Sequence, residues 1–375
     1  MQALDMFLRQ ATDNGTVPGA VVCVACRGEV VWHRAYGAAA LIPEYHPMQC
    51  DTLFDIASLT KVVATTSLLL LAHHESVCHL DDALQHFYPQ TRGTPLGSAT
   101  VRQLLAHTGG LAAWAPLYQV LLPDGPVCHT TSSAAARRHQ AIQTILLEPL
   151  IYPPGSQMLY SDLGFILLAD IVERRYQQPL DRLFRERVAQ PLGLHCTGYR
   201  PLEGPSPPPA SPTAYAATEA CPWRARMLGG EVHDENAWAM GGVAGHAGLF
   251  GTAHQVWRFA QTLLDGWNGQ PWLVPRPTLR AFTTRQESPA GTTWGLGWDT
   301  PTPGHSSAGQ FFPPTSYGHL GFTGNSVWID PTRKVIVVCC TNRVHPSRQR
   351  QGIRTFRPLI HDAVMRALHA DTAEC

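Results

Sequence analysis

The stretch Leu53-Phe54-Asp55-Ile56-Ala57-Ser58-Leu59-Thr60-Lys61 opens an apolar segment that runs to about Glu75 without glycine or proline. Such a segment predicts a buried helix. Residues three apart share one face of a helix, so Ser58 and Lys61 can lie within hydrogen-bonding distance. Lys61 is one of only two lysines among 28 basic residues, and an amine, unlike a guanidinium, can lose its proton in a desolvated site. The pair predicts an activated serine nucleophile.

The bulk composition indicates a globular protein whose 375 residues allow two subdomains that share a cleft. Its net charge is +0, which gives no electrostatic reason to expect nucleic acid or an anionic membrane as a partner. The N-terminus lacks the pattern of a secretory signal, and the longest apolar runs are too short to span a bilayer. We expect a soluble, cytoplasmic protein, monomeric or homo-oligomeric, with reduced cysteines.

Strand-like and helical segments alternate in blocks along the chain. Residues 18–37 read as a β-hairpin, and three strands are expected at 293–299, 317–330 and 334–341, before a final helix at 352–369. The middle of the chain is mostly helical, except for the proline-rich run 201–212, which must be extended. The order predicts an α+β fold, in which an antiparallel sheet flanked by helices (1–57 and 290–375) carries a mostly helical inserted subdomain (58–289). The active site would lie in the cleft between them.

Three further segments carry side chains suited to chemistry. They are Tyr160-Ser161-Asp162 at the start of a predicted helix, the turn His107-Thr108-Gly109-Gly110, and His319-Leu320-Gly321-Phe322-Thr323-Gly324 on a predicted strand. The glycines of the last segment would allow a ligand to approach the backbone. Taken singly, each tyrosine or histidine is more often structural, so their order and spacing decide the interpretation.

In that order the four segments resemble the motifs of the serine β-lactamase and penicillin-binding-protein superfamily, particularly its class C β-lactamase-like serine hydrolases, among them family VIII-type esterases and cell-wall amidases. The resemblance implies that Ser58 attacks an acyl carbonyl and that Lys61 and Tyr160 form a coupled pair that handles its proton. It implies an oxyanion hole formed by the backbone N–H groups of Ser58 and Phe322. The remaining motif positions, expected to bind substrate, are Asp162, His319, Gly321 and His107. No metal or organic cofactor is needed for this chemistry.

Two positions depart from the family pattern. Asp162 stands where the second motif usually has asparagine. An ionised carboxylate there would keep Lys61 charged, which makes Tyr160 the favoured candidate for the base. His319 stands where most β-lactamases have lysine, and a largely neutral imidazole binds a carboxylate more weakly. A third motif that begins with histidine resembles that of carboxylesterases, some D-amino-acid peptidases and some DD-peptidases. This lowers the expectation of efficient β-lactam hydrolysis.

A second string, 230–250, contains His233, Asp234, Glu235 and His246 in a glycine-rich setting. It resembles a subset of these hydrolases that includes muramyl–L-alanine amidases. The four side chains could in principle bind a metal, although their spacing fits no standard zinc pattern. The alternative is a glycine-rich loop that lines the cleft, with His246 hydrogen-bonded.

The sequence therefore favours a hydrolase of a small ester or amide that works through an acyl-Ser58 intermediate. A peptidoglycan-directed amidase or DD-peptidase, or a weak β-lactamase, is the enzymatic alternative. A non-catalytic sensor that is acylated and signals is an alternative of another class, because Asp162 could impair deacylation. No Gly-x-Ser-x-Gly, phosphate-binding loop or His-Glu-x-x-His motif supports other hydrolase or nucleotide-binding classes.

Overall fold

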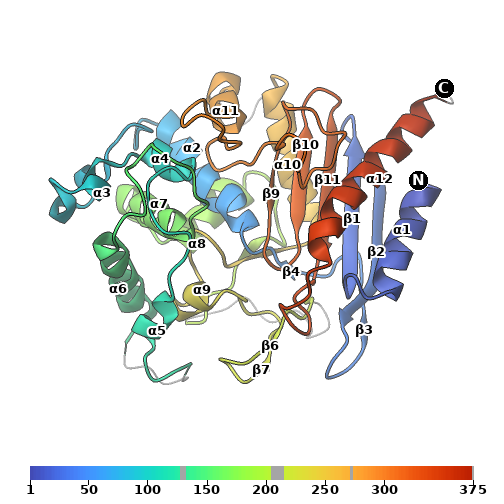
Figure 1. Cartoon of the computed structure of the whole chain (residues 1–375), viewed down its shortest axis with the longest axis horizontal. Coiled ribbons are helices and arrows are strands. Elements are labelled where there is room, and N and C mark those ends of the chain that lie inside the picture. The colour runs from blue at the N-terminus through green and yellow to red at the C-terminus, as the bar shows by residue number, and fades with distance from the viewer. Residues whose placement is uncertain (127–131, 204–214, 271–272, 374–375) are drawn as a thin grey trace.

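The two ends of the chain build one antiparallel sheet. The computed structural model describes residues 1–126, 132–203, 215–270 and 273–373, and within them six strands pair in the order β3-β2-β1-β11-β10-β9 (Figure 1). Their bounds are β1 (Gly19–Cys26), β2 (Glu29–Ala40), β3 (His46–Pro47), β9 (Tyr317–Leu320), β10 (Ser326–Asp330) and β11 (Val335–Thr341). The N-terminal hairpin joins the C-terminal strands where β1 pairs with β11, from Ala20 opposite Thr341 to Cys26 opposite Val335. The predicted fold class is confirmed.

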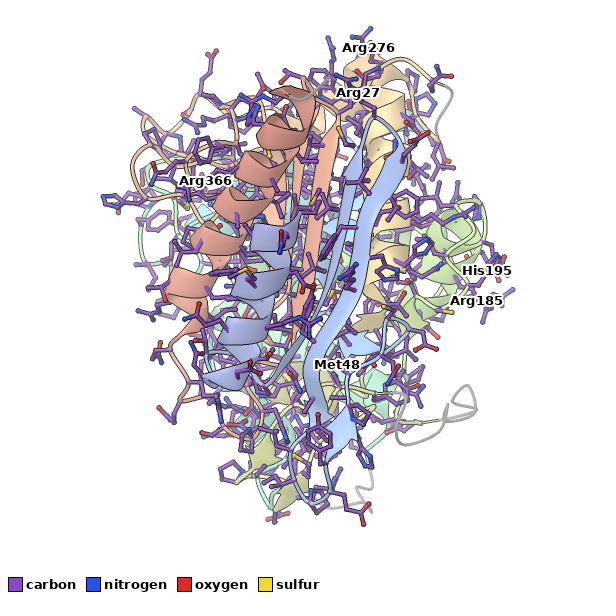
Figure 2. The ribbon with its side chains drawn as sticks, turned by 90° about the vertical axis from the view of Figure 1, so that its right-hand side faces the viewer. Arg27, Met48, Arg185, His195, Arg276 and Arg366 are labelled. Atoms are coloured by element: carbon purple, nitrogen blue, oxygen red, sulfur yellow. The ribbon has the colours of Figure 1, made fainter. Side chains whose placement is uncertain are left out.

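Both faces of this sheet are covered, which explains why β1 is an unbroken apolar run. Side chains alternate along a strand, so Val22 and Val24 join the core beneath α1 (Gln2–Asp13) and α12 (Ile353–Ala373), whereas Val21 and Cys23 join the main core on the other face. Figure 2 shows α1 and α12 lying side by side across the first face. On the second face α10 (Ala253–Trp267) contacts β1, β10 and β11.

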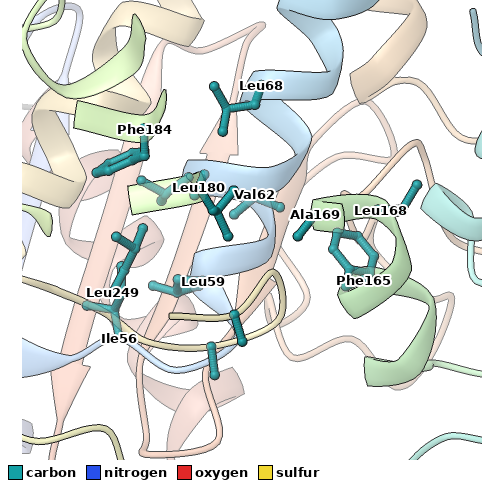
Figure 3. Packing of buried hydrophobic residues seen from close by; sticks show 14 of the residues in the cluster. Ile56, Leu59, Val62, Leu68, Phe165, Leu168, Ala169, Leu180, Phe184 and Leu249 are labelled. Atoms are coloured by element: carbon teal, nitrogen blue, oxygen red, sulfur yellow. The ribbon is translucent and has the colours of Figure 1, made fainter. Parts of the chain in front are cut away.

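A helical layer formed by the middle of the chain lies beside the sheet (Figure 1). A π-helical turn, η1 (Lys61–Thr66), runs directly into α2 (Ser67–His74), and both are almost wholly buried. Figure 3 shows Val62 of this helix packed between Phe165 of α7 and Leu180 of α8. The other helices are α3 (Pro95–Ser98), α4 (Val101–Leu105), α5 (Leu117–Leu121), α6 (Ala134–Leu147), α7 (Asp162–Tyr176), α8 (Leu180–Phe184), α9 (Glu235–Ala239) and α11 (Arg276–Thr283), with short turns η2 (Leu84–His86), η3 (Pro89–Thr91) and η4 (Arg185–Ala189).

Two small sheets connect the layers. In the first, β4 (Phe54–Asp55) and β5 (Gly198–Tyr199) flank β8 (Leu249–Gly251). The second is the hairpin of β6 (Ala220–Cys221) and β7 (Arg226–Met227). Because β4 ends three residues before Ser58, the first sheet fixes where the helix that carries Lys61 begins.

Three predictions about the fold need comment. The predicted strand at 293–299 is wrong: only isolated bridges form, Trp294 with Asp299 and Asp299 with Gly318, because the chain turns at Gly297, whose φ is +83°. The subdomain division at residue 290 stays a prediction, although α10 lies against the sheet. Most of the proline-rich run 201–212 lies outside the described residues. None of the helices in the described ranges is both long and apolar enough to cross a membrane.

Candidate active site

Ser58 sits on a turn that the preceding strand holds in place. Asp55 ends β4, and its Oδ1 accepts a hydrogen bond from the N–H of Ala57 at 2.8 Å. Ala57 has φ +47°, a left-handed conformation that costs a non-glycine residue about 1 kcal/mol or more. The turn leaves Ser58 partly exposed at the start of the helix, where it lines a large cavity.

Lys61 is fully buried, and three acceptors surround its ammonium. Nζ donates to Ser58 Oγ at 2.9 Å, to Asp162 Oδ1 at 2.6 Å and to the carbonyl of His246 at 3.3 Å. Burial lowers the pKa of Lys61, but the Asp162 carboxylate and Tyr160 outweigh burial and raise it above its usual value. Lys61 is therefore a charged donor in the free site, as expected from the carboxylate at position 162.

Tyr160 is held between aromatic rings at the start of α7. Its ring lies 4.5 Å from that of His107, 5.4 Å from Trp294 and 6.0 Å from His319, and the Lys61 Nζ is 4.8 Å from its centre. Burial raises the pKa of Tyr160, although Lys61 and Ser58 pull it down. Tyr160 is therefore a neutral phenol at neutral pH.

His107 lies behind Tyr160, not in the cavity. It is buried, its Nδ1 accepts a hydrogen bond from the backbone N–H of Ser161 at 3.1 Å, and it is absent from the residues that line the cavity. This placement does not fit the prediction that His107 binds substrate. It holds the Tyr160 segment in position instead.

The turn after β9 docks onto the strand that precedes Ser58. Thr323 Oγ1 and Asn325 Nδ2 each donate to the carbonyl of Asp55 at 2.8 Å. A Cβ on Gly321 would meet the carbonyl oxygen of Ile56 at 2.7 Å, so only glycine permits this approach. Phe322 follows in the same turn.

The amides of Ser58 and Phe322 are available to a ligand. Both residues line the cavity, and neither backbone N–H donates a hydrogen bond to any residue that the structure describes. Two free amides on one cavity wall are suited to an oxyanion. The oxyanion hole expected at these two positions stays a prediction.

His319 is a neutral acceptor in the cavity wall. Burial, aided by the charge of Lys61, lowers the pKa of His319 to about 3. Its Nδ1–H donates to the carbonyl of Leu320 at 2.8 Å, which leaves a lone pair on Nε2. That atom is buried without a hydrogen-bond partner among the described residues. His319 can accept a hydrogen bond from a substrate but cannot pair with a carboxylate.

The cavity has a volume of about 800 Å³, and one wall carries cations that the sequence interpretation missed. Arg343, Arg354 and Arg357 line it, and across the described chain none of them forms an ion pair with a carboxylate. Arg343 donates to the carbonyl of Phe322 at 2.8 Å, and Arg357 donates to that of Asn325 at 2.9 Å. Burial lowers the pKa of Arg357 to about 10. The signal was the density of arginine in 343–357, five in fifteen residues.

The cavity is also lined by the charged residues of the second string, and their charges are mutually satisfied. His233 Nε2 lies 3.1 Å from Glu219, and Glu235 pairs with Arg348. Asp234 Oδ1 lies 2.9 Å from His246 Nε2, as expected for a hydrogen-bonded His246 lining the cleft.

The four side chains of residues 233, 234, 235 and 246, which could in principle have bound a metal, are therefore split between separate pairs. A different trio, Asp162, Asp234 and His246, has ligand atoms within 4.8 Å of one another. Asp162 already forms an ion pair with the Lys61 ammonium, so a metal ion bound to this trio would displace Lys61 from Asp162.

Comparison with known proteins places this site in a family. A model of the Beta-lactamase family matches residues 4–361. The chain belongs to this family. It is a serine hydrolase, as the motifs predicted.

Curated relatives extend the likeness. A "Putative D-alanyl-D-alanine carboxypeptidase" of Escherichia coli (strain K12) is 34% identical over 376 residues, covering 92% of this chain and 82% of that protein. A protein of the same description from Salmonella typhi is 32% identical over 373 residues, covering 92% and 83%.

Solved structures share the fold at lower identity. "EstCE1, a hydrolase with promiscuous acyltransferase activity" superposes with a TM-score of 0.71 at 23% identity, covering 95% of this chain and 98% of that one. A class C beta lactamase gives 0.70 at 20%, covering 96% and 97%. The octameric penicillin-binding protein homologue from Pyrococcus abyssi gives 0.71 at 17%, covering 99% and 77%.

Proposed function

We propose that this hydrolase acts on an acyl-peptide with a free terminal carboxylate, of the D-alanyl-D-alanine type, and releases the last residue. The observation that carries this proposal is the wall of Arg343, Arg354 and Arg357 in the cavity that contains Ser58. Arg343 is buried and Arg357 is half-buried, and guanidinium groups in such places without carboxylate partners are costly unless an anion is bound for part of the time. Arg354 is exposed and adds a third positive charge to the same cavity. The name of the Escherichia coli relative agrees with this substrate class.

In this mechanism Ser58 Oγ attacks the carbonyl of the scissile amide and the free amides of Ser58 and Phe322 bind the oxyanion. The neutral phenol of Tyr160, next to Ser58 and Lys61, gives its proton to the leaving amine. The departing residue carries the carboxylate, which the arginine wall holds during acylation. Water then hydrolyses the acyl-Ser58 ester.

A neutral ester is a second candidate substrate because the cavity also presents exposed aromatic side chains. Trp114 and Phe322 are 45% and 48% exposed, and both line the cavity. An acyl chain could pack against them without using the arginines. The sensor alternative, which was based on Asp162 impairing deacylation, stays a prediction; Asp162 Oδ1 accepts a hydrogen bond from Lys61.

The test compares an N-acyl-D-alanyl-D-alanine with its C-terminal amide. Arg354→Gln is the first variant because the side chain is exposed and holds no other group. A charge-assisted hydrogen bond is worth about 1.5–3 kcal/mol, so kcat/KM for the free acid should fall about ten- to a hundredfold while that for the amide stays near wild type.

Arg366→Gln is the matched control, because Arg366 lies on the exposed side of the same helix α12 (Figure 2). This variant should leave kcat/KM unchanged for both substrates. The carboxylate proposal would be refuted if Arg354→Gln lowered kcat/KM equally for the free acid and the amide. It would also be refuted if the wild-type enzyme preferred the amide, or a p-nitrophenyl ester, to the free acid.

A further inference from the structure

We propose that Asp162 is the proton acceptor of the reaction, which takes the proton of Ser58 through Lys61, and that it does not bind substrate. This inference rests on the proposed function only in taking Ser58 as the nucleophile. It assigns a chemical step to a carboxylate at a position where the resembling motif usually has an amide.

The argument begins with the hydrogen bonds around Ser58 Oγ. The Lys61 ammonium donates to Ser58 Oγ, to Asp162 Oδ1 and to the carbonyl of His246, and Tyr160 is a further side-chain partner of the same group. A saturated ammonium has no lone pair with which to accept a further proton. The other neighbour of Ser58, Tyr160, is a phenol whose burial disfavours the phenolate. Neither neighbour of the nucleophile is a base in the free enzyme.

Asp162 can act as the base for Ser58 through Lys61, which lies between them. Its carboxylate is the only one that pairs with Lys61 among the described residues, and the 2.6 Å contact is short enough for direct proton transfer. Asp162 is the first residue of α7, and its N–H donates to the carbonyl of Ala113 at 2.9 Å. The helix and this hydrogen bond together hold its backbone in place. Its side chain is 19% exposed and lines the cavity.

The groups around Asp162 leave it available for this role. Lys61 faces it from η1, Tyr160 from the segment before α7, Asp234 from the cap of α9, and His246 from the loop before β8. Asp234 is already bonded to His246 and to the backbone N–H of Ala237. Within the described ranges, Lys61 is therefore the cation that forms an ion pair with Asp162.

The protons balance over one acylation. Lys61 first passes one proton to Asp162 and becomes a neutral amine, and this amine takes the proton of Ser58 as Oγ forms its bond to the carbonyl carbon. When the scissile C–N bond breaks, Tyr160 gives its proton to the leaving amine and regains one from Lys61, which regains one from Asp162. The net transfer is the serine proton to the amine, and Asp162 ends ionised. In deacylation a water proton follows the same route to Asp162 and returns to Ser58 Oγ.

The matched change is Asp162→Asn, which keeps the shape and a hydrogen-bond acceptor for Lys61 but cannot accept a proton. Loss of the carboxylate also removes a charge that raises the pKa of Lys61. Lys61 then becomes the base, and it works only where it is neutral. The acid limb of kcat/KM against pH should move to higher pH, because activity then requires Lys61 itself to be uncharged.

Two further variants make the test decisive. Asp162→Glu retains a carboxylate, so its acid limb should stay at the wild-type position even if kcat falls. Asp170→Asn is the control: it lies two turns along α7 and loses a carboxylate paired with Arg174, and it should leave the pH profile unchanged. If Asp162→Asn is inactive at every pH, an active Asp162→Glu with the wild-type limb still supports the acceptor role.

An Asp162→Asn enzyme with an unmoved acid limb, or equal inactivity of the Asn and Glu variants, would overturn the inference. Ser58→Ala separates the two proposals. If Ser58→Ala retains turnover, the nucleophile is wrong and the proposed function fails with it. If Ser58→Ala is inactive and the limb does not move in Asp162→Asn, only the role of Asp162 fails.

Discussion

Replacing Gly321 by alanine should separate catalysis from folding. The added Cβ would lie 2.7 Å from the carbonyl oxygen of Ile56 and 3.2 Å from Cβ of Asn325. Non-bonded heavy atoms prefer about 3.5 Å or more, so the turn after β9 must move away from the Ser58 segment by roughly half an ångström or more. No left-handed φ is needed at this glycine, so the effect is steric.

The displaced group is the amide of Phe322, which follows directly. Loss of one oxyanion donor costs about 2.7–4 kcal/mol in the activation free energy, or on the order of 10²–10³ in kcat. Overpacking costs about 1–3 kcal/mol of stability. We expect kcat to fall on the order of a hundredfold with a modest fall in Tm and little change in KM.

The assay is steady-state kinetics on the N-acyl-D-alanyl-D-alanine, with Tm measured on the same samples. Gly229→Ala is the matched control, because a Cβ there meets nothing within 4 Å. It should leave kcat and Tm unchanged. Wild-type kcat in Gly321→Ala would refute the assignment of the Phe322 amide, and so would a loss explained wholly by unfolded protein.

Two predictions concern pH. Because the pKa of His319 is about 3, the imidazole stays neutral from pH 5 to 8, and His319→Gln should change the size of kcat/KM but not its shape over that range; loss of an ionisation near pH 6–7 would contradict this. Burial raises the pKa of Asp299 to about 7, so the folded state binds more protons than the unfolded state between about pH 4 and 7 and stability falls as pH rises through that window. Asp299→Asn should therefore raise Tm at pH 8 more than at pH 4, and an equal effect at both would exclude a charged, buried Asp299.

The sequence was most informative where chemistry constrains local spacing. Ser58 and Lys61 are three residues apart on one helix, so their contact follows from helix geometry. Residues 18–37 were predicted as a β-hairpin, and β1 and β2 form it. The strand expected at 293–299 failed because glycines at 295 and 297 allow the chain to turn, and strand propensity does not register such turns.

The site was predicted less completely where it depends on segments that meet only in the fold. Tyr160, His319 and Phe322 were placed by resemblance, because no spacing rule brings residues so far apart together. His107 was assigned to the substrate, yet the fold puts it behind Tyr160. The arginine wall was missed because residues 343–357 read as an ordinary basic surface until α12 is packed against the sheet.

The sequence by itself determined the class of fold, the spacing of Ser58 and Lys61 and the unusual carboxylate at position 162. Each of these is a matter of residue identity or of contacts within a few residues. The sequence raised a charged Lys61 beside Asp162 and a neutral His319 only as expectations, and the tertiary structure supplied the 2.6 Å contact and the burial behind them. The tertiary structure alone decided that arginines line the cavity that contains Ser58. Charge states and partners depend on burial and on neighbours distant in sequence, and those exist only once the layers have packed.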